Sequence, residues 1–415
     1  YQLITNLHFG GFKLFEEFLI SGFNPKIDNE IFFTVINRLN ETILIGFFSW
    51  LVSIIFGVIF GILTSNIFYK IYNIPIFFCS IIRFFLTIIR SLHEVVWGII
   101  LMQIYGINFS IGILAICIPY IAVNSKVFAE QIETIDYKTF ESINQINAPK
   151  FSSLLTLIWN PIINTFENFG LYRLECSLRS TVILGLFGIG GIGTSILLSF
   201  QTLNFRELWT YLWSLAILIT LSNLIFKKIK FNNTNKILSI VFIAVFFITI
   251  FISFSYFFYF VFNNNFGNIN PISSLFKSRS DLELFDFLKL IFETIILSLL
   301  STGISISLPP LLIGLFNNNT SKILIKSFSF LLRLIPTPLI LLTLLTFNNP
   351  SLSLAALTLG LHNAGITSKL LFTNLDSQDK RHYIAMKSLG ISNKISWLLG
   401  LFSQQAKSYL AYCAY

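Results

Sequence analysis

Long apolar runs separated by short polar connections dominate the pattern of this chain. A helix that crosses a bilayer needs about 20 mostly apolar residues, and roughly ten stretches meet that length. They lie near residues 42–67, 76–105, 109–130, 160–180, 207–226, 237–263, 290–315, 324–347, 351–372 and 397–415. Because none shows the two-residue alternation of a membrane strand, all are predicted to be helices. The pattern therefore predicts an all-α polytopic membrane protein.

The composition agrees with this pattern. Hydrophobic residues make up 54% of the 415 residues and charged residues 11%. The mean hydropathy of +0.76 lies far outside the range of a soluble domain. The net charge is +9, but the lysines and arginines are concentrated in alternate connections rather than on one face. That distribution is the positive-inside signal of cytoplasmic loops, and it does not indicate nucleic-acid binding.

The two halves of the chain resemble each other. Residues 141–150, ESINQINAPK, and residues 384–393, IAMKSLGISN, occupy matching places 243 positions apart. At this offset the aligned pairs include Arg90 with Arg333, Ser125 with Ser368, Lys126 with Lys369, and Asp136 with Asp379. Further upstream, the triplet at 41–43 matches the one at 293–295, both reading ETI, at an offset of 252. These matches predict a tandem duplication.

The duplication divides the chain into four expected parts. Residues 1–40 form an outer-side flank, 41–228 a first transmembrane domain, 229–287 a joint with an extra span and an outer loop, and 288–415 a second transmembrane domain. The extra span gives both copies the same orientation, unlike the inverted repeats of many secondary transporters. Each copy is expected to hold about five to six spans. Since Tyr415 matches Tyr172, the second copy is expected to be incomplete.

The two matching polar stretches each predict a short helix outside the membrane. Their apolar residues recur every three positions, as Phe140, Ile143 and Ile146 in one stretch and Tyr383, Met386 and Leu389 in the other. An apolar stripe on a polar helix is typical of a helix that lies on a surface. Asn147 and Gly390 then tolerate a left-handed turn. Each stretch fits either an interfacial helix that lies on lipid or on its own bundle, or a docking helix. A pair of them suits a two-fold symmetric cytoplasmic partner.

These stretches resemble the EAA loop of ABC importer permeases, the coupling helix that sits in a groove of the ATPase subunit. The matching positions are Glu141, Ser142, Asn147, Ala385 and Gly390. The first copy departs from the family pattern because it has asparagine in place of the family's glycine and serine in place of alanine. The second copy has Ile384 where the family has glutamate.

Other segments narrow the resemblance to permeases of phosphonate-type importers. They are RSLHEVVW at 90–97, SKVFAE at 125–130, LYRLECSLRSTVILGLFGIGGIG at 171–193 and HNAG at 362–365. The resemblance implies two tandem, parallel ABC type-1 permease units that translocate phosphonate or a related phosphorus oxyanion, such as phosphite or phosphate. The implied location is the bacterial cytoplasmic (inner) membrane. The implied partners are a cytoplasmic ABC ATPase dimer, a periplasmic or extracellular substrate-binding protein and membrane lipid.

Motifs for other chemistry are weak or missing in the sequence. GIGGIG at 188–193 satisfies the dinucleotide pattern G-x-G-x-x-G, but no strand is predicted before it and no acidic residue follows about 20 positions later. Its glycines are expected to break a helix or to allow close backbone approach. No phosphate-binding P-loop motif occurs, so a transport subunit rather than an enzyme is predicted. The scattered cysteines and histidines predict neither a metal site nor a cofactor.

Charged residues within the apolar segments are candidates for the transport pathway. If one helix covers residues 76–105, Arg83, Arg90 and Glu94 share one face. Arg90 and Glu94 then form either an ion pair or part of an anion-pathway wall, and Glu175 and Arg179 can pair at a spacing of four. Position 337 has threonine in place of Glu94, whereas Arg333 repeats Arg90. The candidate pathway residues are Arg90, Glu94, Arg173, Glu175, Arg179 and Arg333.

Other functions remain open at this stage. Charges within the membrane also suit a secondary carrier that couples transport to an ion gradient. An ABC permease for another small solute and a membrane-embedded assembly protein are further alternatives. Uptake that survives ATP depletion would indicate the secondary carrier.

Overall fold

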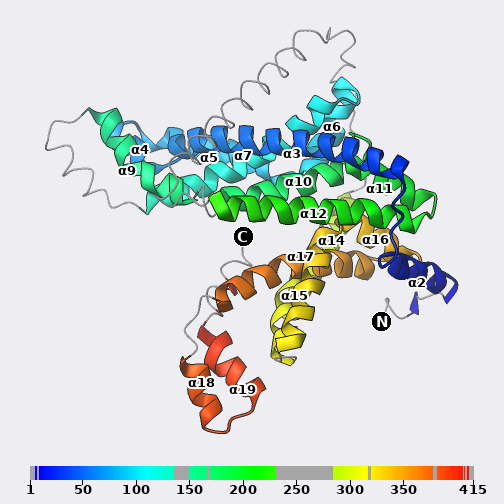
Figure 1. Cartoon of the computed structure of the whole chain (residues 1–415). Coiled ribbons are helices and arrows are strands. Elements are labelled where there is room, and N and C mark those ends of the chain that lie inside the picture. The colour runs from blue at the N-terminus through cyan, green and yellow to red at the C-terminus, as the bar shows by residue number, and fades with distance from the viewer. Residues whose placement is uncertain are drawn as a thin grey trace. The chain divides into compact units, whose positions relative to one another are not determined.

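The computed structural model of the chain is helical (Figure 1). It describes residues 5–6, 9–134, 149–165, 169–229, 284–315, 319–376, 381–404, 406 and 409–410. No strand forms among these residues, so the predicted all-α class is confirmed. The chain divides into two compact units, one of residues Pro25–Lys277 and one of residues Tyr1–Asn24 together with Ser278–Tyr415.

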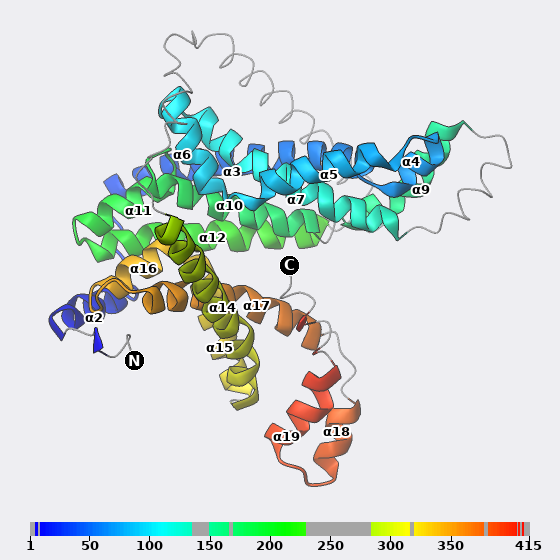
Figure 2. The ribbon, with the colours of Figure 1, turned by 180° about the vertical axis from the view of Figure 1, so that it is seen from behind.

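The unit of residues 25–277 is a bundle built around four long helices. Its helices are α3 (Asn29–Leu63), α4 (Asn66–Tyr72), α5 (Ile76–Ser91), α6 (Glu94–Tyr105), α7 (Phe109–Glu133), α9 (Lys150–Thr165), α10 (Leu171–Leu186), α11 (Ile192–Gln201) and α12 (Phe205–Ile229). Helices α3, α7, α10 and α12 run along the length of this unit, and α4 and α9 lie together at one end of it (Figures 1 and 2).

Small residues allow α3 and α7 to approach closely. A Cβ atom placed on Gly57 would lie 2.5 Å from the Cβ of Asn124, and one placed on Gly61 would lie 2.7 Å from the Cβ of Phe128. The approach also lets the Asn124 amide donate a hydrogen bond of 3.2 Å to the Ser53 hydroxyl. Glycine at helix contacts is typical of membrane proteins, in which association depends on van der Waals packing and hydrogen bonds between helices.

The predicted span at 76–105 is bent. Helices α5 and α6 meet at an angle of 86°. Leu92 has an extended backbone, and His93 caps α6 by accepting a hydrogen bond of 3.4 Å from the amide of Val95. An extended residue followed by a side-chain cap ends one helix and starts another, and the apolar pattern alone does not reveal this break.

The predicted span at 160–180 stays a prediction. Helix α9 ends at Thr165 and α10 begins at Leu171, and residues 166–168 lie outside the described residues. Ser153, Leu154 and Ile158 of α9 are buried.

The other unit contains the second half of the chain and its first residues. Its elements are η1 (Phe9–Gly11), α2 (Phe12–Ser21), α14 (Leu284–Leu315), α15 (Asn319–Leu334), α16 (Thr337–Leu345), α17 (Leu352–Asp376), α18 (Arg381–Ser388), α19 (Asn393–Trp397) and a π-helical turn, η4 (Leu398–Phe402). The ring of Phe347 lies 5.2 Å from that of Phe12 and 4.9 Å from that of Phe15. These contacts fix α2 to the end of α16, so the expected flank at 1–40 is divided between α2 and the start of α3.

Among the described residues, three helices are long and apolar enough to cross a membrane, namely α3, α7 and α14. The number rises to five if each bent pair, α5 with α6 and α15 with α16, counts as one span. The predicted span at 237–263 lies outside the described residues, as do residues 405, 407–408 and 411–415 of the one at 397–415. The chain is therefore a multi-pass membrane protein.

The helix boundaries repeat along the chain. Helix α15 starts and ends 243 residues after α5, since 319 minus 76 and 334 minus 91 both equal 243. Helix α17 (Leu352–Asp376) likewise starts and ends 243 residues after α7. The bend recurs as well, because α15 and α16 meet at 96°. The same offset that aligns the residues thus aligns the breaks between helices.

The tight contact between α3 and α7 generates a prediction. Gly57→Ala is expected to destabilise the protein by about 1–3 kcal/mol, because the new methyl group overlaps Asn124. Gly303→Ala is the control, since a Cβ there meets nothing within 4 Å, and it is expected to stabilise α14 by about 0.5–1 kcal/mol. Thermal unfolding in detergent, followed by tryptophan fluorescence, measures both. Equal melting temperatures for the two variants would contradict the packing described here.

Candidate functional site

The second of the two matching polar stretches forms a helical hairpin of α18 and α19. Helix α18 is followed by Gly390, whose φ of 79° lies in the left-handed region. The Gly390 amide donates to the carbonyl of Lys387, and the Ile391 amide donates to that of Met386. This pair of bonds is the Schellman motif, which closes a helix with a glycine. The short helix and its turn at Gly390 were predicted correctly, and Ala385 lies exposed on the helix.

The apolar stripe of α18 is divided between two surroundings. Tyr383 is half-buried and packs against the core of its own unit, where its backbone lies against Gly400. Leu389 is 78% exposed and its neighbour on the other side of the helix, Ile384, is 61% exposed. The packing of Tyr383 fits the alternative of a helix on its own bundle, whereas the exposed residues still fit a docking helix. One side of α18 holds the helix in place, and Ile384 and Leu389 remain accessible.

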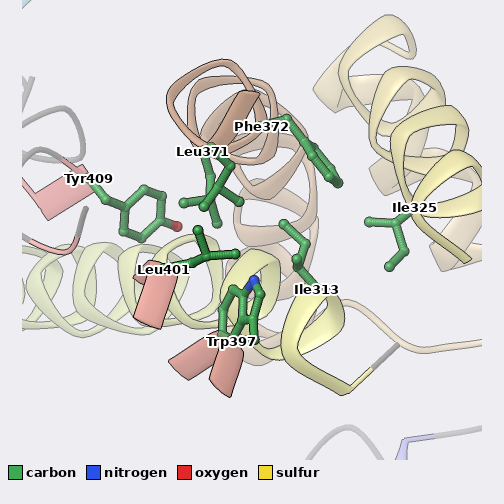
Figure 3. Close-up of a cluster of buried hydrophobic side chains, with 8 residues drawn as sticks. Ile313, Ile325, Leu371, Phe372, Trp397, Leu401 and Tyr409 are labelled. Carbon is green, nitrogen blue, oxygen red and sulfur yellow. The ribbon is translucent and has the colours of Figure 1, made fainter. Parts of the chain in front are cut away.

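A buried cluster fixes the hairpin to the long helices of its unit (Figure 3). We call it the Trp397 cluster; its residues are Ile313, Ile325, Leu371, Phe372, Leu375, Trp397, Leu401 and Tyr409. Trp397 is 3% exposed, and its indole fits against Gly314 near the end of α14. The Tyr409 hydroxyl donates a hydrogen bond of 2.9 Å to the carbonyl of Ile306 in α14. A displacement of the hairpin must therefore move the ends of α14 and α17.

An equivalent cluster lies in the other unit. It consists of Ile67, Ile71, Ile132, Leu154 and Ile158, contributed by α4, α7 and α9. Its last three members stand 243 positions before Leu375, Trp397 and Leu401 of the Trp397 cluster. The predicted coupling residues of this half, Glu141, Ser142 and Asn147, lie outside the described residues.

Among the candidate pathway residues, Glu94 belongs to a buried polar chain. Its carboxylate accepts a hydrogen bond of 2.6 Å from the Ser180 hydroxyl, which lies 2.7 Å from the hydroxyl of Tyr120. His93 approaches the same carboxylate to 3.5 Å. The chain links the start of α6 to α10 and α7.

Arg173 extends this chain toward α3. Its guanidinium stacks 3.9 Å from the ring centre of Tyr120, a cation–π contact, and donates a hydrogen bond of 3.2 Å to the side chain of Asn124. Asn124 in turn donates to Ser53. The polar side chains of Tyr120, Asn124 and Ser180 were missed in the sequence. The sequence could have indicated them, because a polar residue within an apolar span needs a hydrogen-bond partner.

The predicted pair of Glu175 and Arg179 is confirmed. Their charged atoms lie 3.5 Å apart on α10, and both side chains are almost fully buried. Arg333 of the other unit is also buried, and its guanidinium lies 5.6 Å from the ring centre of Phe330. Within the unit of residues 25–277, Glu94 and Arg173 join one chain, Glu175 and Arg179 form a pair, and Arg90 lines a separate cavity.

The predicted ion pair of Arg90 with Glu94 is wrong. The bend at Leu92 and His93 directs α6 away from the axis of α5, so the two residues do not share a helical face. Glu94 joins the buried chain with Ser180, whereas Arg90 lines a separate cavity between α5 and α7. The prediction placed Arg90 beside Glu94 because it assumed one continuous helix over residues 76–105.

The glycine-rich segment forms a turn that is held by α3. The Glu41 carboxylate accepts a hydrogen bond of 2.8 Å from the amide of Gly191, and the Thr42 hydroxyl accepts one of 2.8 Å from the amide of Ile192. Gly191 has a φ of 76°, and a Cβ on Gly193 would lie 2.1 Å from the carbonyl oxygen of Val182. The glycines break the helix and permit close approach, as predicted. Helix α10 precedes them rather than a strand, which contradicts a dinucleotide site.

Comparison with known proteins finds partial similarity to transport permeases. No protein-family model matches the chain, and no solved structure matches it. Over 142 residues it is 28% identical to a phosphite transport system permease protein of Stutzerimonas stutzeri, a match that covers 34% of this chain and 52% of that protein. Over 117 residues it is 27% identical to a phosphate-import permease protein of Mycolicibacterium smegmatis, which covers 28% of this chain and 22% of that one.

A third relative is shorter. It is a protein of Escherichia coli named as a cryptic phosphonate transport system permease, 24% identical over 117 residues, which cover 28% of this chain and 96% of the relative. The chain spans about half the length of the phosphite permease that it matches. The fold is that of an all-α, multi-pass membrane protein. Its similarity is to permeases for phosphite, phosphate and phosphonate, as the sequence predicted.

The Trp397 cluster generates a second prediction. Trp397→Ala is expected to remove packing worth about 3–5 kcal/mol and to release the hairpin locally, since the indole fills the space beside Gly314. Hydrogen exchange followed by mass spectrometry should then show faster exchange in residues 381–404 and unchanged exchange in α7. Trp213→Ala is the control, because Trp213 in α12 is 37% exposed. Unchanged exchange in α18 would show that Trp397 does not hold the hairpin.

Proposed function

We propose that this chain is the membrane subunit of a bacterial ABC importer that carries phosphite, phosphate or a phosphonate across the cytoplasmic membrane. The observation that carries the proposal is the hairpin of α18 and α19, which is exposed on one side and anchored to α14 and α17 on the other. The similarity to permeases of phosphorus oxyanions supports the substrate class.

The proposed partner at the hairpin is a cytoplasmic ATPase dimer. Ile384 and Leu389 offer apolar side chains beside the exposed Ala385, and a small residue there lets a partner groove approach the helix backbone. Lys387 and Lys394 lie exposed on the same hairpin, which the positive-inside rule assigns to the cytoplasm. Energy must come from the partner, because the chain has no P-loop motif of its own.

Two permease units in one chain would supply both docking sites of a two-fold ATPase. The supporting observations are the common offset of 243 residues in helix boundaries and the equivalent clusters around Trp397 and Leu154. In the first unit the docking helix would be formed by the stretch with Glu141, Ser142 and Asn147. Closure of the ATPase would push each docking helix, and the anchored side chains would transmit that push to the long helices, which alternate between outward-open and inward-open states.

A second candidate is a carrier driven by an ion gradient, and one observation favours it. The carboxylates of Glu94 and Glu175 are buried among the helices, and such groups serve as ion or proton sites in secondary transporters. The two candidates differ in energy source, which makes them separable by one measurement.

The proposal is tested by reconstitution. Proteoliposomes that contain the chain with its ATPase and binding-protein partners should take up radiolabelled phosphite or phosphate when ATP is supplied, and ionophores should not abolish this uptake. Uptake that persists without ATP and collapses with an ionophore would overturn the importer and establish the carrier.

The docking surface generates a third prediction. Leu389→Asp is expected to weaken ATPase association at least tenfold, equivalent to about 1.4 kcal/mol, because a charge replaces an apolar contact at the tip of the hairpin. Phe23→Asp is the matched control, since Phe23 is 94% exposed and lies far along the chain between α2 and α3. Co-elution of the ATPase with the detergent-solubilised chain measures the effect. Equal co-elution of both variants would exclude Leu389 from the docking surface.

A further inference from the structure

A cavity of about 230 Å³ lies between α5 and α7, at the end of the unit where α3 terminates at Thr64. It is distinct from the buried chain of Glu94 and from the hairpin. Its charged lining residues are Arg83 and Arg90 from α5 and Lys126, Glu130 and Glu133 from α7. A site of this size is smaller than the roughly 300–1,000 Å³ that drug-sized ligands occupy, so it suits a small ion with water.

The charges that line the cavity do not cancel. Arg83 pairs with Glu133 and also donates to the carbonyl of Thr64. Lys126 lies 3.6 Å from Glu130, four residues further along α7. Arg90 forms neither an ion pair nor a hydrogen bond with any residue that the structure describes, although it lines the same space. Three cations against two carboxylates leave one net positive charge, and its source is Arg90.

The same cationic positions recur in the other half of the chain. Lys326, Arg333 and Lys369 stand 243 positions after Arg83, Arg90 and Lys126. The acidic positions change, because Thr373 replaces Glu130 while Asp376 replaces Glu133. The three positive residues are therefore repeated on the corresponding helices α15 and α17, whereas only one of the two acidic residues is repeated.

We propose that the cavity between α5 and α7 binds a small tetrahedral phosphorus oxyanion, with Arg90 as its principal ligand. A guanidinium offers two parallel N–H groups that match two oxygens of such an anion. Arg83 and Lys126 lie on the two walls of the cavity, each paired with a carboxylate, so the net attraction for an anion comes from Arg90. The identification of the bound anion as substrate on its way to the cytoplasm rests on the proposed function. The binding of the anion in the cavity is independent of that function.

Direct binding tests the site without transport. The full chain in phosphatidylcholine nanodiscs is titrated with inorganic phosphate, and binding is followed by ³¹P NMR line broadening. Arg90→Gln is expected to weaken binding at least tenfold, whereas Lys13→Gln, which removes one exposed charge from α2, leaves it unchanged. Thr87→Glu is the second variant, because it keeps Arg90 but places a carboxylate three residues away that neutralises it. Binding that is equal in the wild type, Arg90→Gln and Thr87→Glu overturns the proposal.

The same positive charge could bind the phosphate of a lipid headgroup. A second experiment distinguishes a lipid phosphate from free inorganic phosphate. Nanodiscs that contain phosphatidylglycerol should bind inorganic phosphate as well as those that lack it. Loss of phosphate binding in the anionic lipid would mean that the cavity holds a headgroup, which overturns a site for the free ion.

Import measurements then distinguish this proposal from the proposed function. If the wild type imports phosphate with ATP and Arg90→Gln does so at the same rate, the site is refuted and the importer stands. If the wild type shows no ATP-driven import but binds phosphate through Arg90, the importer is refuted and the site stands. The expected result is import that falls at least tenfold in Arg90→Gln while the ATPase still co-elutes with the chain.

Discussion

Wherever a helix is interrupted, its last carbonyls or first amides need hydrogen-bond partners, and the structure depends on the side chains that provide them. In hydrocarbon an unpaired amide or carbonyl costs several kcal/mol, so each interruption needs a partner from the protein. Glu41 and Thr42 supply acceptors at the start of α11, His93 supplies one at the start of α6, and Arg83 supplies donors to Thr64 at the end of α3. These side chains decide where the helices can end, and thereby where the bends lie.

The interruptions determine what the candidate sites contain. The bend between α5 and α6 separates Arg90 from Glu94, which turns a possible ion pair into two environments. Glu94 is buried and accepts a hydrogen bond from the Ser180 hydroxyl, whereas Arg90 lines an open, positive cavity. At the other end of the chain, the turn at Gly390 reverses the direction of the backbone, so that one side of α18 packs on the core while Leu389 points outward. Both features follow from backbone geometry at one or two residues.

The sequence predicted the helical class, the short helix before Gly390 and the pair of Glu175 with Arg179, because each depends on local spacing. The tandem repeat stays a prediction. The buried chain of Ser180, Tyr120 and Arg173 also depends on contacts between helices far apart in the sequence. The positions of Glu141, Ser142 and Asn147 stay predictions. The different burial of Tyr383 and Leu389, which belong to one stripe in the sequence, depends on the core against which α18 packs.

The position of α2 has a topological consequence. Because residues 1–24 belong to the same unit as residues 278–415, the polypeptide passes between the two units twice, once at Asn24–Pro25 and once at Lys277–Ser278. A protease that cuts once within residues 230–283 therefore leaves α2 on the amino-terminal fragment, while the ring of Phe347 that it packs against is on the carboxy-terminal one. The contacts of Phe347 with Phe12 and Phe15, one tilted and one edge-on, are then non-covalent contacts between two separate fragments.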